Sequence, residues 1–365
     1  MKISLAGLGT ALPANQAPQQ LAADFASSLI REDDKHARVL KKLYRQSGVA
    51  SRSSVLLRGT SETKLIQDFY PASSVENRRG PSTSARMQRY EQDAPQLAIT
   101  AARHAFVDAQ IDADQITHLV TVSCTGFSSP GVEFRLIEEL GLSETVARTN
   151  LGFMGCHGAI NGLRVAQAFA ASNQEARVLV CAVELCSLHL QYGWHPDWIV
   201  SNALFADGAA AAILSSQPSN SSPITLAATA SKVFPGTEQE MSWKVGDFGF
   251  EMSLSPRVPE VISDSLRPWL IAWLATHDLT IDQIQGWAVH PGGPRILQAC
   301  EEALELPCDA MDVSREILSS CGNMSSPTVL FILERFRQEN RHLPWVSLAF
   351  GPGLVAEAAL FTGPS

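Results

Sequence analysis

The residues Gly152-Phe153-Met154-Gly155-Cys156-His157-Gly158-Ala159 join a predicted strand at 148–151 to a predicted helix at 159–171. Glycines on both sides of Cys156 permit a tight turn that lifts the thiol out of a sheet and directs it at the start of the helix. Because the positive end of a helix favours a thiolate, we expect the pKa of Cys156 to lie below its usual value of about 8.5. A buried structural cysteine is the alternative, but the glycine setting favours a nucleophile.

Predicted strands and helices alternate on both sides of this turn. Those of the first half are a strand at 3–8, a helix at 94–109, a strand at 118–123, a helix at 132–140, and strands at 177–183 and 209–214. The second half repeats the order, with a strand at 224–230, a helix at 258–275, a strand at 287–290, helices at 294–304 and 326–338, and strands at 346–350 and 354–361. Two α/β halves of similar plan predict a duplicated fold.

The chain divides into two predicted domains. Residues 18–95 are more polar than the rest, with a charge cluster at 31–36, and are expected to form a mostly helical excursion over the surface. The Ser/Pro/Asn-rich stretch 215–223 is the best candidate for a linker. We therefore predict an N-terminal half at 1–223, which holds the insertion at 18–95 and the nucleophile, and a C-terminal half at 224–365.

Composition indicates a folded protein with a large core. Hydrophobic residues make up 45% of the 365 residues and charged residues 18%, against a usual charged share of about 25%. The formal net charge of −9 argues against nucleic acid or an anionic membrane surface as the main partner.

No apolar run approaches the ~18 residues that span a bilayer, so we expect a soluble, cytoplasmic protein without membrane insertion. The seven cysteines lack Cys-x-x-Cys spacing, which argues against a disulfide framework and a zinc site.

Two further residues stand at predicted ends of elements. His290 ends the strand at 287–290 and precedes Pro-Gly-Gly-Pro, at the edge where open α/β sheets bind ligands, although a core histidine is the alternative. Asn323 precedes the last predicted helix, whose expected cap is Ser326 and whose first residue is Pro327. By itself, Asn323 is typical of a turn.

Cys156, His290 and Asn323 together match the chemistry of acyl transfer. A histidine can stabilise a thiolate as an ion pair, and histidine and asparagine can both donate to an oxyanion. A papain-like hydrolase has the same order of residues, and the 134 residues from Cys156 to His290 fall within its range. Its Cys-Gly-Ser-Cys-Trp signature and its early nucleophile are absent here.

Further motifs narrow the choice of enzyme family. They are Ala203-Leu204-Phe205-Ala206-Asp207-Gly208-Ala209-Ala210, His290-Pro-Gly-Gly-Pro, Gly322-Asn323-Met324-Ser325-Ser326 and Phe350-Gly351-Pro352-Gly353. With the residues around Cys156, they make the chain resemble, almost end to end, the type III polyketide synthases, the chalcone synthase-like branch of the thiolase superfamily. The resemblance is to bacterial-type members. It implies a duplicated thiolase-like fold layered αβαβα, a homodimer and an acyltransferase.

The resemblance also implies roles for single residues. In that family the cysteine matching Cys156 carries the growing chain as a thioester, and the residues matching His290 and Asn323 bind the thioester carbonyl of malonyl-CoA. Loss of carbon dioxide builds negative charge on that oxygen, so two fixed donors stabilise the transition state. A phenylalanine matching Phe205 stands between the CoA tunnel and the cavity. The implied substrates are acyl-CoA and malonyl-CoA, and no metal or redox cofactor is implied.

Coenzyme A is anionic, and the family binds it with basic residues on an N-terminal helix. Lys42 and Arg45 match that Lys-x-x-Arg spacing, whereas Val49 stands where plant members have a third basic residue. Lys41 is equally consistent with a solvated, charged face of the helix.

The family's pocket-lining positions indicate the substrate. They map to Met252, Cys124, Thr125, Ser129, Glu184, Cys186, Leu188, His189, Ser201, Leu254 and Ser325. Met252 replaces a phenylalanine of plant chalcone synthases and makes a softer gate. Small side chains at Thr125, Ser129 and Cys186 resemble bacterial members in which a tunnel opens for a fatty-acyl starter. His189 is bulkier than the plant residue and restricts elongation, so a medium- or long-chain starter with few extensions satisfies both observations.

Cys124 resembles a second cysteine of bacterial members that make tetrahydroxynaphthalene from malonyl units alone, although a small core residue is the alternative. Aldol ring closure in the family uses a water held by residues matching Cys124, Glu184 and Ser325, and a thiol forms weaker hydrogen bonds than a hydroxyl. Release as an α-pyrone needs less from the protein, because the enol oxygen of the chain itself attacks the thioester. We therefore favour alkylpyrone over alkylresorcinol products.

Other functions stay open at this point. One is a malonyl-primed aromatic polyketide synthase. Another is a ketoacyl-ACP synthase III-like enzyme, which shares the Cys-His-Asn set but makes one condensation and needs an acidic carrier protein. A non-enzymatic binding module would leave Cys156 unreactive, and a hydrolase would cleave esters or peptides without malonyl-CoA.

Overall fold

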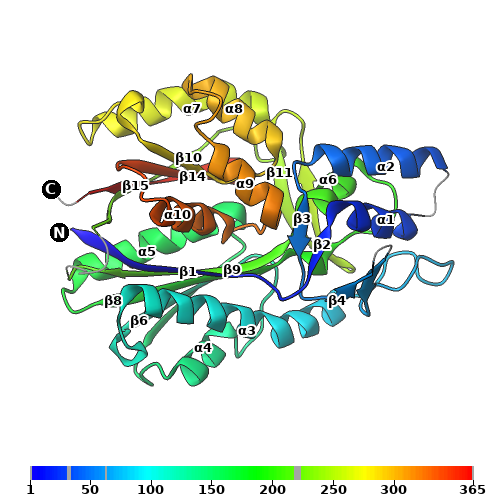
Figure 1. The fold of residues 1–365 in the computed structure, drawn as a ribbon, viewed down its shortest axis with the longest axis horizontal. Coiled ribbons are helices and arrows are strands. Elements are labelled where there is room, and N and C mark those ends of the chain that lie inside the picture. Colours follow the sequence, from blue (N-terminus) through cyan, green and yellow to red (C-terminus); the bar gives the residue numbers. More distant parts are fainter. Residues whose placement is uncertain (1, 31–33, 62–63, 218–222, 364–365) are drawn as a thin grey trace.

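Five layers of helices and sheets form the fold. The computed structural model describes residues 2–30, 34–61, 64–217 and 223–363. Helices α3 (Thr83–Ala109) and α4 (Val132–Leu140) cover one sheet, α7 (Val258–Ala275) and α8 (Pro294–Leu304) cover the other, and α5 (Gly158–Ser172) and α10 (Thr328–Gln338) lie between the sheets (Figure 1). The predicted duplicated αβαβα fold is confirmed.

The N-terminal sheet carries its strands in the order β1 (Ile3–Ala11), β9 (Asp207–Ser215), β8 (Arg177–Leu185), β6 (His118–Ser123) and β7 (Ala147–Gly152). Strand β6 is parallel to β7 and β8, whereas β9 is antiparallel to β8 and β1. Strands β8 and β9 are apolar along most of their length because helices cover both faces of the sheet.

The C-terminal sheet has the order β13 (Gly286–Val289), β14 (Trp345–Gly351), β15 (Val355–Thr362) and β10 (Thr225–Val233). It joins the first sheet through β1 and β10, which pair only at Ile3↔Leu226 and Ser4↔Thr225. Beyond these pairs the two sheets diverge and leave room for the central helices.

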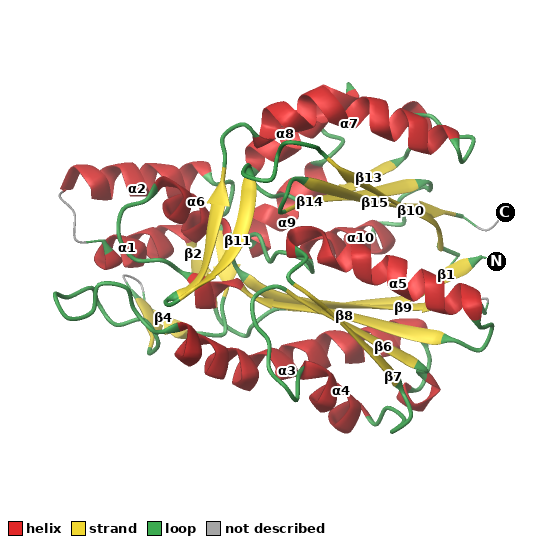
Figure 2. Ribbon diagram, turned by 180° about the vertical axis from the view of Figure 1, so that it is seen from behind, coloured by secondary structure: helices red, strands yellow, loops and turns green. Residues whose placement is uncertain are grey.

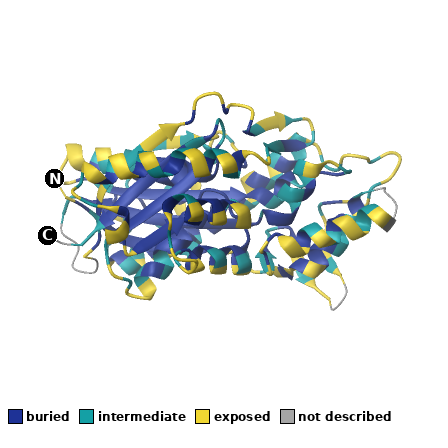
Figure 3. Ribbon diagram, turned by 90° about the horizontal axis from the view of Figure 1, so that it is seen from above, coloured by how far each residue is buried: buried dark blue, intermediate teal, exposed yellow. Residues whose placement is uncertain are grey.

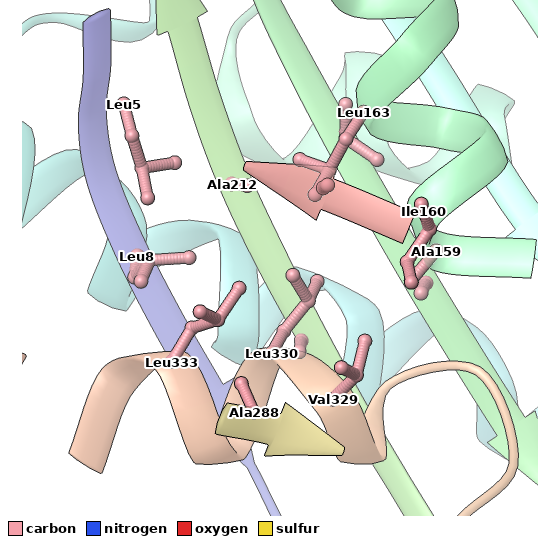
Figure 4. Packing of buried hydrophobic residues seen from close by; sticks show 14 of the residues in the cluster. Leu5, Leu8, Ala159, Ile160, Leu163, Ala212, Ala288, Val329, Leu330 and Leu333 are labelled. Carbon is pink, nitrogen blue, oxygen red and sulfur yellow. The ribbon is translucent and has the colours of Figure 1, made fainter. Parts of the chain in front are cut away.

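The central layer holds much of the core. Ile160 and Leu163 of α5 and Val329, Leu330 and Leu333 of α10 point into a common apolar space between the sheets (Figure 4). Burying such a side chain stabilises the fold by about 1.5–3 kcal/mol. Strands β9 and β14 are buried throughout and β8 along almost all of its length, whereas exposed positions lie on β7, on the end of β10, on the outer helices and in the loops (Figure 3).

Several predicted elements match the observed ones with the same bounds, among them β6, α4, α7 and α8. Two predicted helix starts were wrong. Helix α3 begins at Thr83 rather than at residue 94, because Ser82 caps it through Ala85 N and the helix accommodates Pro95 internally. Helix α10 begins at Thr328 with Pro327 as its N-cap, so Ser326 is not the cap.

The insertion at 18–95 is less helical than predicted. It contains α1 (Gln19–Leu29) and α2 (Asp34–Gln46), but short strands follow at β3 (Ser51–Ser53), β4 (Leu57–Thr60) and β5 (Leu65–Gln67). Strand β3 pairs with β2 (Gln16–Pro18), which is distant in sequence, so no local periodicity marked it. Part of the predicted charge cluster (31–33) and part of the predicted linker (218–222) lie outside the described residues.

Three elements near the insertion were missed. They are α6 (Pro196–Leu204), the hairpin of β11 (Met241–Gly246) and β12 (Gly249–Leu254), and α9 (Asp312–Cys321). The hairpin stands beside α6 and α2 (Figure 2). No helix within the described ranges is long and apolar enough to cross a membrane.

Candidate active site

Cys156 lies in a single 3₁₀ turn, Gly155–His157, between β7 and α5, as the glycine-flanked motif predicted. Gly155 has a φ of +74°, and a Cβ atom placed on it would approach Pro352 Cδ to 2.5 Å. Any other residue here would be strained in its backbone and would collide with Pro352. The motifs at 152–159 and 350–353 are therefore two sides of one turn.

Burial decides the charge of the Cys156 thiol. Desolvation raises the pKa of Cys156 to about 12, although the polar side chains of Ser325 and Asn323 nearby oppose the shift. The expectation that the helix would hold this pKa below 8.5 was wrong. The thiol lies too deep for the dipole of α5 to offset the loss of water around a lone anion.

His290 follows β13 and is buried, with its backbone N–H donating to Leu348 O at 2.8 Å. Among the described residues, neither ring nitrogen has a hydrogen-bond partner. Burial lowers the pKa of His290 to about 3, with a smaller effect of His157 in the same direction, so the ring is neutral. A buried polar group without a partner is costly, and this one opens into a cavity that it shares with Cys156 and Asn323.

Asn323 is held by backbone pairing with the segment that carries Phe205. Its N–H donates to Leu204 O, and its carbonyl accepts from Ala206 N, both at 2.9 Å. The side-chain Oδ1 accepts from Ser325 N at 2.8 Å. Because the amide oxygen is occupied, the amide nitrogen is the end that can donate to a ligand.

His157, next to the nucleophile, has a structural role. Its Nδ1 lies 2.7 Å from Asn161 Oδ1 on the same helix, and Asn161 Nδ2 donates to Glu357 at 3.1 Å. The ring is buried against Gly351.

Four cavities follow one another through the site. The entrance cavity is lined by α2, α6 and the start of α8. The catalytic cavity contains Cys156, His290 and Asn323, and the junction cavity contains Cys124, Cys156 and Phe205. The tail cavity lies beneath the insertion. Leu254, Gly292 and Ile296 line both the entrance and the catalytic cavities. Met252 lines the catalytic, junction and tail cavities, so the four cavities adjoin one another in a row, which we call the route.

The tail cavity extends away from the nucleophile. Its far walls are mostly apolar, with Ala22, Phe25, Leu57 and Leu65 among them. These residues belong to α1, β4 and β5. The insertion therefore covers a cavity, which its polar sequence did not indicate.

A fully buried carboxyl group supports the junction cavity from behind. Glu184 accepts hydrogen bonds from Cys124 N at 2.9 Å, Thr125 Oγ1 at 2.7 Å and Ser326 Oγ at 2.6 Å. Burial raises the pKa of Glu184, and these bonds oppose the shift. The Cys124 Sγ atom lies 3.2 Å from Ser325 Oγ, so the structure brings the predicted group Cys124, Glu184 and Ser325 together.

An aromatic wall separates the junction and tail cavities. His189 Nε2 lies 2.6 Å from Thr125 O, and Phe250 N donates to His189 Nδ1 at 2.9 Å, which assigns the proton to Nε2. The ring stacks on Phe250, and Trp243 Nε1 donates to Cys124 O at 2.7 Å. Burial lowers the pKa of His189 to about 3. The wall is neutral and fixed in place.

Most predicted pocket residues line this route: Phe205, Met252, Cys124, Thr125, Cys186, His189, Ser201, Leu254 and Ser325. Three do not line any of the four cavities in the part of the chain that the structure describes. Ser129 is exposed, Leu188 belongs to the core, and Glu184 lies behind the junction wall. Lys42 and Arg45 are exposed on α2, whereas Lys41 is paired with Asp24 at 2.6 Å.

Sequence reasoning missed several lining residues. Pro352 belongs to the motif at 350–353, so the sequence could have marked it as a residue of the site. Met241 on β11 and Ile296 on α8 carried no signal, because only the packing of the hairpin and of α8 brings them to Cys156.

Comparisons with known proteins agree with this geometry. The family models described as chalcone and stilbene synthases match here in two parts, the N-terminal domain at residues 2–218 and the C-terminal domain at residues 225–363. The chain is 29% identical over 364 residues to the alpha-pyrone synthesis polyketide synthase-like Pks18 of Mycobacterium tuberculosis, covering 97% of this chain and 90% of that protein.

Two further similarities span the whole chain. The 1,3,6,8-tetrahydroxynaphthalene synthase of Streptomyces peucetius is 32% identical over 363 residues, which cover 98% of this chain and 92% of that protein. The crystal structure of PKS-I from the brown alga Ectocarpus siliculosus superposes with a TM-score of 0.91 at 29% identity, covering 99% of this chain and 98% of that one.

Proposed function

Since the chain belongs to the chalcone and stilbene synthase family of type III polyketide synthases, which are acyltransferases that perform decarboxylative condensations, we propose that it extends a medium- or long-chain fatty acyl-CoA with malonyl-CoA and releases an alkylpyrone. One observation carries the proposal. A largely apolar tail cavity continues the route beyond the catalytic cavity with Cys156, His290 and Asn323.

The first step loads the starter. The Cys156 thiol passes its proton to the unpaired imidazole of His290, and the sulfur attacks the thioester carbonyl of the acyl-CoA. Forming both charges as a neighbouring pair avoids the cost of a lone buried thiolate, which the raised pKa of Cys156 reflects. The bond from the carbonyl carbon to the sulfur of CoA breaks, and CoA leaves with a proton.

The second step extends the chain. His290 and the free amide of Asn323 donate to the thioester oxygen of malonyl-CoA, carbon dioxide leaves, and the electron pair of the broken bond forms an enolate. The enolate carbon attacks the acyl group on Cys156 and releases the thiolate. The lengthened chain, now on CoA, can reload Cys156 for the next round.

The proton transfer predicts how Cys156 reacts with iodoacetamide in His290→Gln. Without the imidazole, the raised pKa leaves the thiol protonated at pH 7, and its thiolate fraction increases about tenfold for each pH unit up to the pKa. We expect alkylation at pH 7 to be at least tenfold slower than in the wild type and to rise steeply towards pH 10. Peptide mass spectrometry measures the rate at Cys156 and at the exposed Cys308 as an internal control. Equal rates and equal pH curves at Cys156 would rule out the transfer.

The acyl chain lies, in this proposal, in the tail cavity beneath α1 and β4–β5. Cys186, Phe205 and Met252 line the passage from the junction cavity. The route that the sequence indicated through Ser129 is not supported, because Ser129 is exposed. The fixed wall of His189 and Trp243 limits the room for elongation, which favours few extensions and early release as a pyrone.

A second candidate is a synthase that primes itself with malonyl units and makes an aromatic product. It is favoured by Cys124, which shares the junction cavity with Cys156. The two candidates differ in the starter that they require.

Mass spectrometry of products from malonyl-CoA and a ladder of starters, acetyl-CoA to stearoyl-CoA without carrier protein, tests the proposal. We expect pyrone masses that track the starter. In Leu65→Trp, whose side chain fills the far end of the tail cavity, we expect products from the longest starters to fall at least tenfold while those from short starters persist. Each methylene excluded from an apolar site costs about 0.8 kcal/mol.

Ile66→Trp is the matched control, since Ile66 is the next residue of β5 and its side chain is 51% exposed. It should leave the product profile unchanged. An unaltered profile in Leu65→Trp would place the acyl chain elsewhere. A malonyl-derived aromatic from every reaction would favour the second candidate, and activity only with a carrier protein would favour a ketoacyl synthase III-like enzyme.

A further inference from the structure

We propose that Arg295 binds a phosphate group of coenzyme A at the entrance cavity, which is lined on another side by α2, the helix that carries Lys42 and Arg45. The inference rests on the proposed function, because that function makes CoA thioesters the substrates. It adds a binding residue from the C-terminal half of the chain, where the family resemblance implied only residues of an N-terminal helix.

Arg295 stands at the rim of the entrance cavity. It is the second residue of α8, directly after Pro294, and it lines the cavity opposite Leu43 and Gln46 of α2. The two helix ends meet nearby, because a Cβ atom on Gly48 would approach Pro294 Cγ to 2.9 Å. The start of α8 and the end of α2 therefore form facing sides of one opening.

Arg295 and the two cations of α2 have no partners in the part of the chain that the structure describes. Arg295, Lys42 and Arg45 are exposed, and none of them forms a hydrogen bond or an ion pair with any residue that the structure describes. Lys41, on the same helix as Lys42, is paired with Asp24 instead. Arg295 itself lines the entrance cavity, and Lys42 and Arg45 stand next in sequence to the lining residues Leu43 and Gln46. In a chain of net charge −9, these cations provide a local attraction for an anion. Asp197 also lines the cavity and is the acidic group that faces them.

The position just after α2 that matches a third basic residue of the family cannot bind a phosphate here. Val49 is buried in a small cluster with Leu204 and Leu318. Arg295 supplies a positive charge to the same opening from across the cavity. Its planar guanidinium can form two parallel hydrogen bonds with one phosphate, which a lysine cannot.

Arg295 is also placed along the route to the reacting atoms. Gly292 lines both the entrance and the catalytic cavities, and the segment from His290 to Arg295 runs between them. One segment thus carries an oxyanion donor at its inner end and the cation at its outer end. A thioester whose carbonyl meets His290 would have its pantetheine arm directed towards Arg295.

Kinetics of Arg295→Ala with two forms of the substrate test the proposal. We expect the KM for malonyl-CoA to rise about 5- to 10-fold with little change in kcat, since an exposed charge-assisted contact is lost. The KM for malonyl-N-acetylcysteamine, which lacks the nucleotide and all phosphates, should not change. Lys41→Ala is the matched control, because Lys41 is already paired with Asp24, and it should alter neither value. An unchanged KM for malonyl-CoA, or an equal rise for both substrates, would overturn the proposal.

Binding of CoA alone separates this inference from the proposed function. Isothermal titration calorimetry with CoA needs no turnover, and we expect a 5- to 10-fold higher Kd in Arg295→Ala than in the wild type. The same difference in a protein that makes no polyketide would support Arg295 while contradicting the proposed function. Equal Kd values would remove Arg295 from the site even if the enzyme makes a pyrone.

Discussion

We expect Cys156→Ala to make no polyketide and to carry no acyl group. The proposed reaction passes through a thioester on this sulfur in every round, so its removal deletes the covalent step, and we expect product formation to fall at least ~10³-fold. Intact-protein mass spectrometry after incubation with acyl-CoA shows whether the acyl group is attached. Liquid chromatography with mass detection measures the product.

Cys124→Ala is the matched control for this variant. Cys124 lines the junction cavity with Cys156, is likewise buried and has a pKa raised well above its usual value by the same burial. Its variant should still carry the acyl group. Thermal unfolding should show that both variants stay folded, because each change removes a single sulfur atom from the wall of a cavity. An acylated, active Cys156→Ala protein would end the proposed mechanism.

Asn323→Ala loses decarboxylation while it keeps acylation. The amide nitrogen of Asn323 is the donor left free by the bond from Ser325 N to its oxygen. Removing one preorganised donor to an oxyanion typically costs about 10²- to 10³-fold in rate. We expect that loss in the formation of acetyl-CoA from malonyl-CoA without a starter. Loading of the starter onto Cys156, measured by intact mass, should persist.

Asn323→Asp separates the chemical role from a structural one. Aspartate keeps the oxygen that accepts from Ser325 N, and it keeps the backbone pairing with Leu204 and Ala206. It lacks the donor and places a negative charge beside the developing oxyanion, so decarboxylation should be as low as in Asn323→Ala. A normal rate in Asn323→Asp with a low rate in Asn323→Ala would assign Asn323 to the fold alone.

Much of the fold could be predicted because its elements carry local signals. Helix α7 has apolar residues at helical spacing, and β6 is a short, mostly apolar run. The short strand β3 has no such signal, since it exists through pairing with β2, a distant segment that the fold brings beside it. Helix α3 was predicted too short because the regular pattern was taken to begin at residue 94, whereas the helix begins at Thr83 and continues through Pro95.

In the candidate site, too, some features carry a local signal in the sequence and others do not. Cys156, His290 and Asn323 stand at turns with glycine or proline neighbours, which mark element ends in a sequence, and the structure brings all three to one cavity. The pKa of Cys156 was predicted in the wrong direction, because burial outweighs the helix and burial is not a local property. Arg295 was not predicted as a binding residue, because the sequence around it does not show that α8 begins across the entrance cavity from α2.

The sequence by itself therefore determined the duplicated α/β plan, the family and the three residues of the catalytic cavity, since turns, periodicity and motifs are properties of contiguous residues. Only the tertiary structure decided the course of the route from the entrance to the tail cavity, the cover that the insertion provides, and the neutral state of the lone thiol and imidazole. Each of these depends on how much water and which distant side chains surround a group. Those surroundings exist only after the chain has packed.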